Sequence, residues 1–188
     1  KRAGLLSAPL RDRFQVRQHL DFYNEDELKQ IVNRSAQKLV VQIEPAAAEE
    51  IARRSRGTPR VANNLLRWVR DYSTSKSDGR ITREITHDAM EMDGIDALGL
   101  DRQDRKYLET IITIYAGGPV GIEALAHTLN VSTDTLVDEV EPFLLRQGLV
   151  TRTTRGRVVT AQAYQHLHRS PPVDGAASEG PLPGNMFP

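Results

Sequence analysis

The sequence predicts a mainly α-helical chain in two parts, the second of which ends in a small β-hairpin. Three observations lead to this fold class. Apolar residues return at helical spacing in one segment after another. Several of these segments begin with a residue that caps helices and end at a glycine. Near the C-terminus two short runs, residues 149–152 and 157–160, flank the turn sequence TTRG and are typical of a hairpin.

The first part begins with a helix predicted over residues 25–38. Asn24 and Glu27 have the spacing of a capping box, in which each side chain bonds to the backbone of the other residue. Residues 40–43 form a brief extended bridge. Pro45 then suits the start of a second helix, and Gly57 ends it.

A third helix is predicted to start where Thr58 can cap it and Pro59 can occupy its first position. Its apolar face repeats at helical spacing and has to pack on a core: Val61, Leu65, Trp68, Val69 and Tyr72. Thr86 is expected to cap a short fourth helix through residue 92. Together these helices predict a small helical unit.

The second part follows a joint at residues 94–99. It contains helices predicted over residues 101–115, 122–129 and 132–147, the first capped by Asp101 and the third by Ser132. Pro142 should bend the third helix, since proline cannot donate a backbone hydrogen bond. Three helices followed by a hairpin are typical of a winged helix-turn-helix.

The two ends of the chain have less regular patterns. Residues 16–22 alternate imperfectly and suggest a short strand. Residues 170–188 are rich in proline and glycine with isolated apolar residues, which predicts a disordered tail.

Charge is balanced overall but uneven along the chain. There are 25 basic and 25 acidic residues, so net charge favours no partner. Six arginines and no acid lie between Glu50 and Asp71, and five arginines and no acid lie between Glu141 and Asp174. These stretches indicate two basic surfaces, either for anionic partners or as solvated helix faces. The absence of cysteine excludes disulfides and thiolate metal sites, and a cytoplasmic location fits it.

Two arginines are candidates for a nucleotide phosphate. Arg60 lies in the first turn of the third helix, where unpaired N–H groups and the helix dipole favour an anion. It could equally be a solvated arginine. Arg13, next to Phe14, could face a phosphate or form an ordinary surface salt bridge.

The hairpin carries Arg152, Arg155 and Arg157, which suit a DNA backbone or protect a strand edge. The third helix of this part is expected to show acids on its outer face, which would repel DNA: Asp134, Asp138, Glu139 and Glu141. We therefore expect the hairpin, and not that helix, to contact DNA. No phosphate-loop motif occurs, and His166 and His168 are spaced unfavourably for a metal site, so none is predicted.

Six segments of the chain together carry a family resemblance: RAGLLSAPLRDRF, DFY, RSRGTPRVANNLLRWVRDY, DGIDALGLDRQDRKYL, GGPVG and EPFLLRQGLVTRTTRGRV. They resemble the C-terminal part of the RuvB family, AAA+ motors that migrate Holliday junctions. They occur in family order over most of residues 2–160. The chain departs from the family at Gln15, where glycine is usual, and at Thr154, where proline is usual and a looser hairpin tip is expected.

The resemblance implies a domain plan and residue roles. Residues 1–22 would be the end of a large ATPase domain, 23–93 the AAA+ small helical lid, 96–169 a winged-helix DNA-binding head and 170–188 a tail. Arg13 would be an arginine finger at a neighbour's ATP, Tyr23 would pack near the adenine, and Arg60 would be the sensor-2 arginine. Arg152 and Arg157, and more weakly Arg155, would contact DNA phosphates.

The resemblance also implies the activity and the partners. The complete protein would be an ATP-dependent DNA helicase in recombination, repair and the SOS response, built as a homo-hexamer. Its partners would be Holliday-junction DNA, the junction-binding protein RuvA and the resolvase RuvC, and magnesium would reach ATP through the large domain. Without phosphate-loop and Walker B motifs, this segment should be inactive alone. The residues leave two other classes open: a stand-alone winged-helix DNA-binding regulator and a protein-interaction module.

Overall fold

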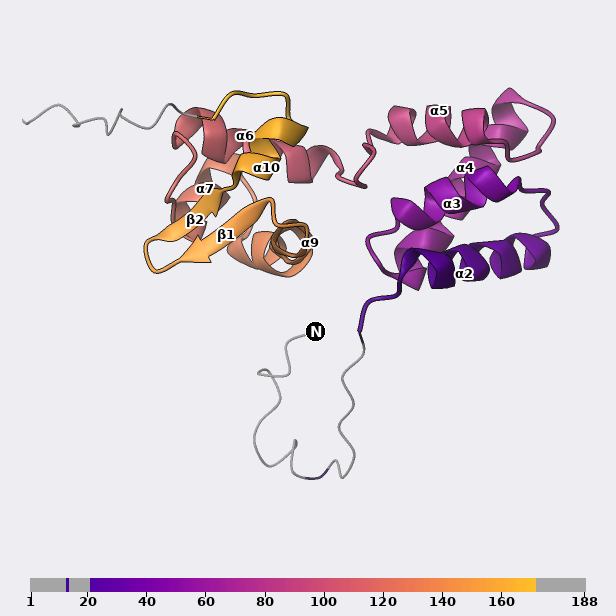
Figure 1. Cartoon of the computed structure of the whole chain (residues 1–188), viewed down its shortest axis with the longest axis horizontal. Coiled ribbons are helices and arrows are strands. Elements are labelled where there is room, and N and C mark those ends of the chain that lie inside the picture. Colours follow the sequence, from indigo (N-terminus) through magenta and orange to yellow (C-terminus); the bar gives the residue numbers. More distant parts are fainter. Residues whose placement is uncertain (1–12, 14–20, 172–188) are drawn as a thin grey trace, which may run out of the picture. The chain divides into compact units, whose positions relative to one another are not determined.

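The chain is mainly α-helical, as predicted, and it divides into two units between Arg105 and Lys106 (Figure 1). This computed structural model describes residue 13 and residues 21–171. The strand predicted over residues 16–22 falls largely outside that part, and Asp21 and Phe22 are not in a strand. Gln15 and residues 172–188 of the predicted tail also lie outside it.

Within its described residues, the first unit contains four complete helices in chain order: α2 (Glu25–Lys38), α3 (Pro45–Arg53), α4 (Pro59–Lys76) and α5 (Arg83–Asp93). The predicted capping box is confirmed, with Asn24 Oδ1 accepting from Glu27 N and Glu27 Oε2 accepting from Asn24 N, both at 2.9 Å. Two cap predictions need correction. Thr58 is the N-cap residue of α4, as predicted, but its hydroxyl donates to Ser55 O and its side chain makes no bond to the helix. The cap of α5 is Thr82, because that helix begins one turn earlier than predicted.

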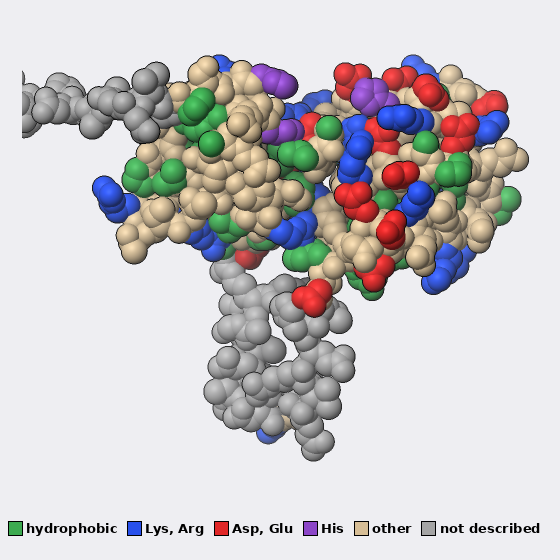
Figure 2. All heavy atoms as spheres, viewed as in Figure 1, with side chains coloured by type: hydrophobic (Ala, Val, Ile, Leu, Met, Phe, Trp, Pro, Cys, Tyr) green, Lys and Arg blue, Asp and Glu red, His purple; other side chains and the backbone are tan. Residues whose placement is uncertain are grey.

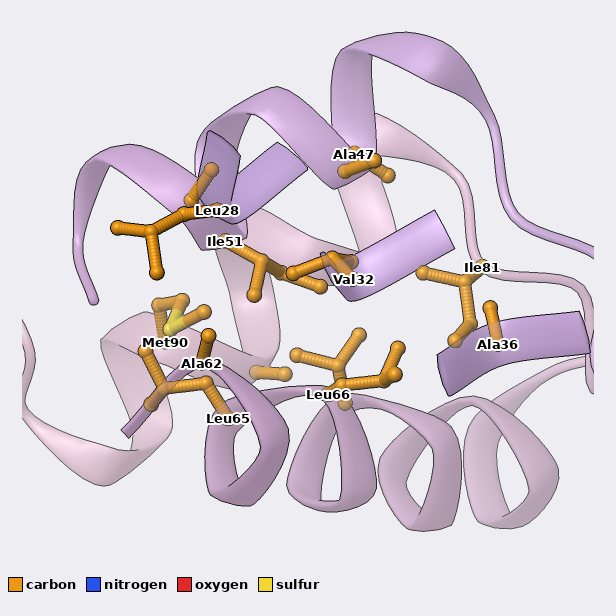
Figure 3. Close-up of a cluster of buried hydrophobic side chains, with 14 residues drawn as sticks. Leu28, Val32, Ala36, Ala47, Ile51, Ala62, Leu65, Leu66, Ile81 and Met90 are labelled. Atoms are coloured by element: carbon orange, nitrogen blue, oxygen red, sulfur yellow. The ribbon is translucent and has the colours of Figure 1, made fainter. Parts of the chain in front are cut away.

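The four helices enclose one apolar core (Figure 3). Its buried residues come from every helix and from Ile81, which pairs with Ile43 in a short parallel bridge. Trp68 packs at the edge of this core and donates its indole N–H to Ala89 O at 2.8 Å. The core residues labelled in Figure 3 are Leu28, Val32, Ala36, Ala47, Ile51, Ala62, Leu65, Leu66, Ile81 and Met90. This packing fixes α4 and thereby the position of its first turn.

Two of the six arginines expected on the first basic surface contact the protein itself instead, Arg54 buried and Arg56 half-buried. Arg54 is 4% exposed, bonds to Ile95 O at 2.9 Å and pairs with the buried Glu50. Arg56 donates to Gly99 O and to Asp101 Oδ2, each at 2.9 Å. These arginines therefore hold the segment that follows α5 against the first unit, and that segment is not a free joint.

The second unit contains most of α6 (Arg102–Ile114) and then α7 (Ile122–Leu129). The predicted cap of α6 is confirmed, with Asp101 Oδ1 accepting from the backbone of Gln103 and Asp104. The largest fully buried residues of this unit are Tyr107, Leu108, Ile111, Leu125, Leu136 and Leu144. A final short helix, α10 (Ala161–His166), follows the hairpin.

The predicted third helix of this unit is interrupted. Residues capped by Ser132 form α8 (Thr133–Thr135), then a π-helical turn, η2 (Leu136–Val140), then α9 (Glu141–Arg146). Within this run Glu141 N donates to Leu136 O, five residues back. Pro142 explains the change, since its ring would clash with the carbonyl four residues earlier in an α-helix. The disturbance expected from Pro142 therefore takes the form of a wider turn just before it.

The hairpin pairs β1 (Val150–Thr153) with β2 (Gly156–Val159) in antiparallel register, with Arg152 opposite Arg157. A third segment joins at the other side of β2, where Val120 and Arg157 exchange backbone hydrogen bonds of 3.0 and 2.8 Å. Gly156 permits this approach, because a Cβ there would collide with the carbonyl of Val120. The hairpin is therefore anchored to the loop between α6 and α7.

Candidate functional site

The first candidate site is the start of α4. Arg60 lies in the first turn and its side chain is exposed, and it has no hydrogen-bond or ion-pair partner in residues 21–171. In the same part of the chain no side chain caps α4, so its N-terminal amide groups remain available to an anion. The arrangement suits a phosphate, which would satisfy both the amides and the guanidinium.

The chain places Tyr23 at the same loop. Tyr23 N donates to Gly57 O at 3.0 Å, three residues before Arg60. Tyr23 is 46% exposed, and Phe22 beside it is 58% exposed. An aromatic ring and an unpaired arginine at one end of a helix can contact a base and a phosphate. The structure thus brings two of the predicted nucleotide contacts to one edge of the first unit.

Arg13 is described only as an exposed residue in a turn. The residues on both sides of it lie outside the described part, so its predicted role as an arginine finger stays a prediction.

The second candidate site is built on the hairpin and centres on a buried carboxylate. Glu141 is 0% exposed, which makes the prediction that it faces solvent wrong. One of its oxygens, Oε1, accepts from Tyr107 Oη at 2.8 Å and from Arg157 Nε at 2.7 Å. The other, Oε2, accepts from Arg152 Nε at 2.9 Å and Arg157 Nη2 at 3.3 Å, and it also pairs with Arg152 Nη2. The carboxylate therefore links both strands of the hairpin to α6.

The position of Glu141 follows from the helix that carries it. A π turn holds more residues per turn than an α-helix, so it changes which residues after it face inward. Val140, Phe143 and Leu144 around Glu141 are buried, and Glu141 is buried with them.

The electrostatics of this cluster favour a charged carboxylate. Burial by itself would raise the pKa of Glu141, but the hydrogen bonds from Arg157, Tyr107 and Arg152 outweigh it and hold that pKa below its ordinary value. The bond to Glu141 raises the pKa of Arg157, and burial together with the negative carboxylate raises the pKa of Tyr107. With two arginines on one glutamate, the cluster keeps one positive charge in excess.

The two arginines differ in their access to solvent. The Arg152 side chain is 45% exposed and that of Arg157 is 17% exposed. Arg155 is exposed at the turn and has no partner within the described ranges. The surface that the hairpin offers to a partner is therefore formed by Arg155 and Arg152, with Arg157 behind them.

The helical run before the hairpin keeps the acidic outer face that was predicted, apart from Glu141. Asp134, Asp138 and Glu139 are exposed. In the first unit, by contrast, basic and acidic side chains alternate over the face shown in Figure 2. In the second unit, the exposed Arg152 and Arg155 therefore give the hairpin a cationic surface.

Other site classes find no support in the residues that the structure describes. They contain no group of three His, Cys, Asp or Glu side chains placed to hold a metal ion. None of their helices is both long and apolar enough to cross a membrane.

Comparison with known proteins identifies the family. Residues 23–96 match the RuvB AAA lid domain, and residues 97–168 match the RuvB C-terminal winged helix domain. The chain belongs to the RuvB family. The family boundary at residues 96–97 precedes the division of the structure at Arg105, because Arg54 and Arg56 hold the intervening residues on the first unit.

Two further comparisons agree. The chain is 55% identical over 171 residues to the Holliday junction branch migration complex subunit RuvB of Rhodopirellula baltica, covering 91% of this chain and 47% of that protein. Its structure resembles the Thermotoga maritima RuvB Holliday junction branch migration motor with a TM-score of 0.84 and 54% identity. That match covers 90% of this chain and 57% of the other, and a point mutant of the same RuvB gives a TM-score of 0.85. The chain thus spans about half the length of the curated RuvB relative it matches.

Sequence reasoning missed two residues of the hairpin site. Glu141 was assigned to an exposed face, and Tyr107 was expected only as part of a helix. The one available signal was the position of Glu141 inside the apolar run VEPFLL, where an unpaired acid would be costly.

Proposed function

We propose that this chain is the nucleotide-sensing lid and the DNA-binding head of an ATP-driven motor that migrates Holliday junctions. The observation that carries the proposal is the exposed Arg60 at the uncapped start of α4, with Tyr23 bonded to the same loop. A helix start of this kind binds phosphate readily. Within a RuvB-type lid, this edge would face ATP held by the large domain.

Each nucleotide contact then has its own role. Arg60 contacts the terminal phosphates of ATP as a sensor-2 arginine, and Tyr23 packs near the adenine. Arg13 acts as an arginine finger at the ATP of a neighbouring subunit. The magnesium ion is held by the large domain. Loss of the γ-phosphate then removes a ligand of Arg60, and the lid moves.

The DNA contacts would come from the hairpin. Arg152 and Arg157, with a weaker contribution from Arg155, bind backbone phosphates, since the cluster carries excess positive charge and the neighbouring helical run shows acids. This supports recognition of the duplex by its backbone and not by base edges. As a whole the protein would be a cytoplasmic homo-hexamer that works with RuvA and RuvC in recombination and repair.

The nucleotide roles can be tested in the complete subunit. Arg13→Ala and Arg60→Ala should each abolish most ATP hydrolysis, and an arginine finger typically contributes about a thousandfold or more. Arg67→Ala is the matched control, because Arg67 is an exposed arginine further along α4 and should be dispensable. Turnover at the level of the control would remove the assigned role from either residue.

The alternative function is that of a stand-alone winged-helix DNA-binding regulator. The test that separates the two is competition between duplexes of different sequence. A phosphate-binding hairpin should bind all of them alike, with an affinity that falls steeply with salt. A strong preference for one sequence would favour the regulator.

A further inference from the structure

The cluster at Glu141 places a buried acid between two arginines that would otherwise repel each other. Arg152 and Arg157 are directly opposite in the hairpin register, where like charges are destabilising. Each donates its Nε to a different oxygen of the same carboxylate, at 2.9 and 2.7 Å. The carboxylate therefore makes this pair of arginines compatible with the folded hairpin.

The carboxylate also occupies the donors that a DNA phosphate would need. Both Nε and Nη2 of Arg152 point to Glu141 Oε2. The same two donors form the usual bidentate contact of an arginine with a phosphate. Arg152 cannot give this fork to Glu141 and to DNA at the same time.

The contacts show which of the two arginines can be released from the Glu141 carboxylate. The Arg152 side chain is 45% exposed and contacts one carboxylate oxygen, whereas the Arg157 side chain is 17% exposed and contacts both. If Arg152 leaves, Glu141 still has Arg157 and the hydroxyl of Tyr107. The buried charge is then never left without partners, which would be very costly.

We propose that Glu141 competes with DNA backbone phosphates for Arg152, which moves from the carboxylate to the phosphate when duplex DNA binds. Tyr107 and Arg157 keep their bonds to Glu141, and Arg157 reaches a phosphate only through its remaining N–H groups. This inference deepens the proposed DNA-binding function and rests on it. Glu141 thus lowers the affinity of the hairpin for DNA and makes release easier. In a protein that moves along duplex, contacts of this kind can be made and broken repeatedly.

The test is duplex binding by the 188-residue chain, measured by fluorescence anisotropy at several salt concentrations. Glu141→Gln should tighten binding about fivefold, which corresponds to the roughly 1 kcal/mol of a partly exposed ion pair. Glu139→Gln is the matched control, because it removes an exposed acid close by and should act only through screened charge, changing binding less than about twofold. Adding Arg152→Ala to Glu141→Gln should abolish the gain.

Two outcomes would overturn the inference. Glu141→Gln could bind no tighter than Glu139→Gln, or it could keep its gain without Arg152. If the wild-type chain bound no duplex at all, the proposed DNA-binding function would fail, and the inference with it. If the wild-type chain bound duplex and Glu141→Gln did not change its affinity, the competition by Glu141 would be refuted and the proposed DNA-binding function would stand.

A second measurement covers the case in which Glu141→Gln does not fold. NMR signals of the arginine Nε–H groups can be followed in the wild-type chain as duplex is added. The signal of Arg152 should shift and exchange, while the signal of Arg157 should remain protected. An unchanged Arg152 signal at saturating DNA would contradict the exchange of partners.

Discussion

Arg157→Ala should strongly destabilise the second unit while leaving the first unit unaffected. The substitution removes two of the donors to the fully buried Glu141, those at 2.7 and 3.3 Å. Breaking a buried pair by removing one partner costs about 3–5 kcal/mol. Because Arg152 and Tyr107 remain, we expect the lower end, about 3 kcal/mol. For a unit of this size that corresponds to a fall in melting temperature of about 12–24 °C.

The chain provides its own internal control for this experiment. Its one tryptophan, Trp68, lies in the first unit, so tryptophan fluorescence reports that unit alone. Far-UV circular dichroism reports both units. The variant should move one dichroism transition to lower temperature and leave the fluorescence transition where it is in the wild type.

Matched arginines in the hairpin define the comparison. Arg155→Ala removes an exposed side chain without a partner in the described residues and should change stability by less than about 0.5 kcal/mol. Arg152→Ala should lose about 1 kcal/mol of stability, between the losses of Arg155→Ala and Arg157→Ala, because the Arg152 side chain is 45% exposed and its ion pair is screened. If Arg157→Ala and Arg155→Ala had the same melting temperature, the stability of the buried Glu141 carboxylate would not depend on Arg157.

The effect should also depend on pH in a defined direction. The pKa of Glu141 is below its ordinary value in the folded chain, so its contribution to stability is present above the pKa of the unfolded chain. It is lost as pH falls through the folded pKa. The difference between wild type and Arg157→Ala should therefore be largest near neutral pH and shrink in acid. A difference that grew in acid would refute the assignment of the charge.

Two further substitutions test other parts of the fold. Gly156→Ala should lower the free energy of unfolding by more than about 2 kcal/mol, because the φ of Gly156 is +139° and a Cβ would meet the carbonyl of Val120. Denaturant unfolding followed by circular dichroism would measure this loss. An unchanged free energy of unfolding would mean that Val120 is not held against Gly156. Asp104→Asn should gain stability relative to wild type as pH rises. Burial raises the pKa of Asp104 from 3.8 to about 6, although Arg56 opposes this rise, so wild type loses up to roughly 3 kcal/mol between those values. Urea unfolding followed by Trp68 fluorescence at pH 4 and pH 7 would measure the difference in stability between Asp104→Asn and wild type. The same difference at both pH values would contradict a raised pKa for Asp104.

Much of the fold could be predicted because its signals are local. Asn24 and Glu27 determine the start of α2 through contacts three residues apart, and Pro45 and Pro59 occur at the first positions of α3 and α4. The failure at Thr86 is also local. Thr82 lies one turn earlier, and the sequence does not say which of the two threonines takes the extended conformation of a cap. Thr58 does take that conformation, but its hydroxyl bonds to Ser55 O and not to α4.

The hairpin site could be predicted only in part, because its decisive contacts are long-range. The arginines were visible in the sequence, but their partner is 11 to 16 residues away and the tyrosine is 34 residues from it. Helical periodicity put Glu141 outside, since it assumes an unbroken α-helix. In the same way, the pairing of Val120 with Arg157 leaves no local pattern.

The π turn before Pro142 has a consequence for how this segment tolerates change in length. Deleting one residue from Leu136–Val140 would allow ordinary α-helical bonding to continue toward Glu141. A π turn of five residues and an α turn of four both carry the chain through slightly more than one full turn, so the later residues would keep their direction. Glu141 would then stay in the interior, and the paired arginines would keep their common counter-ion. The extra residue is therefore accommodated within that one turn, so this segment should accept a chain shorter by one residue better than the regular helices on either side of it.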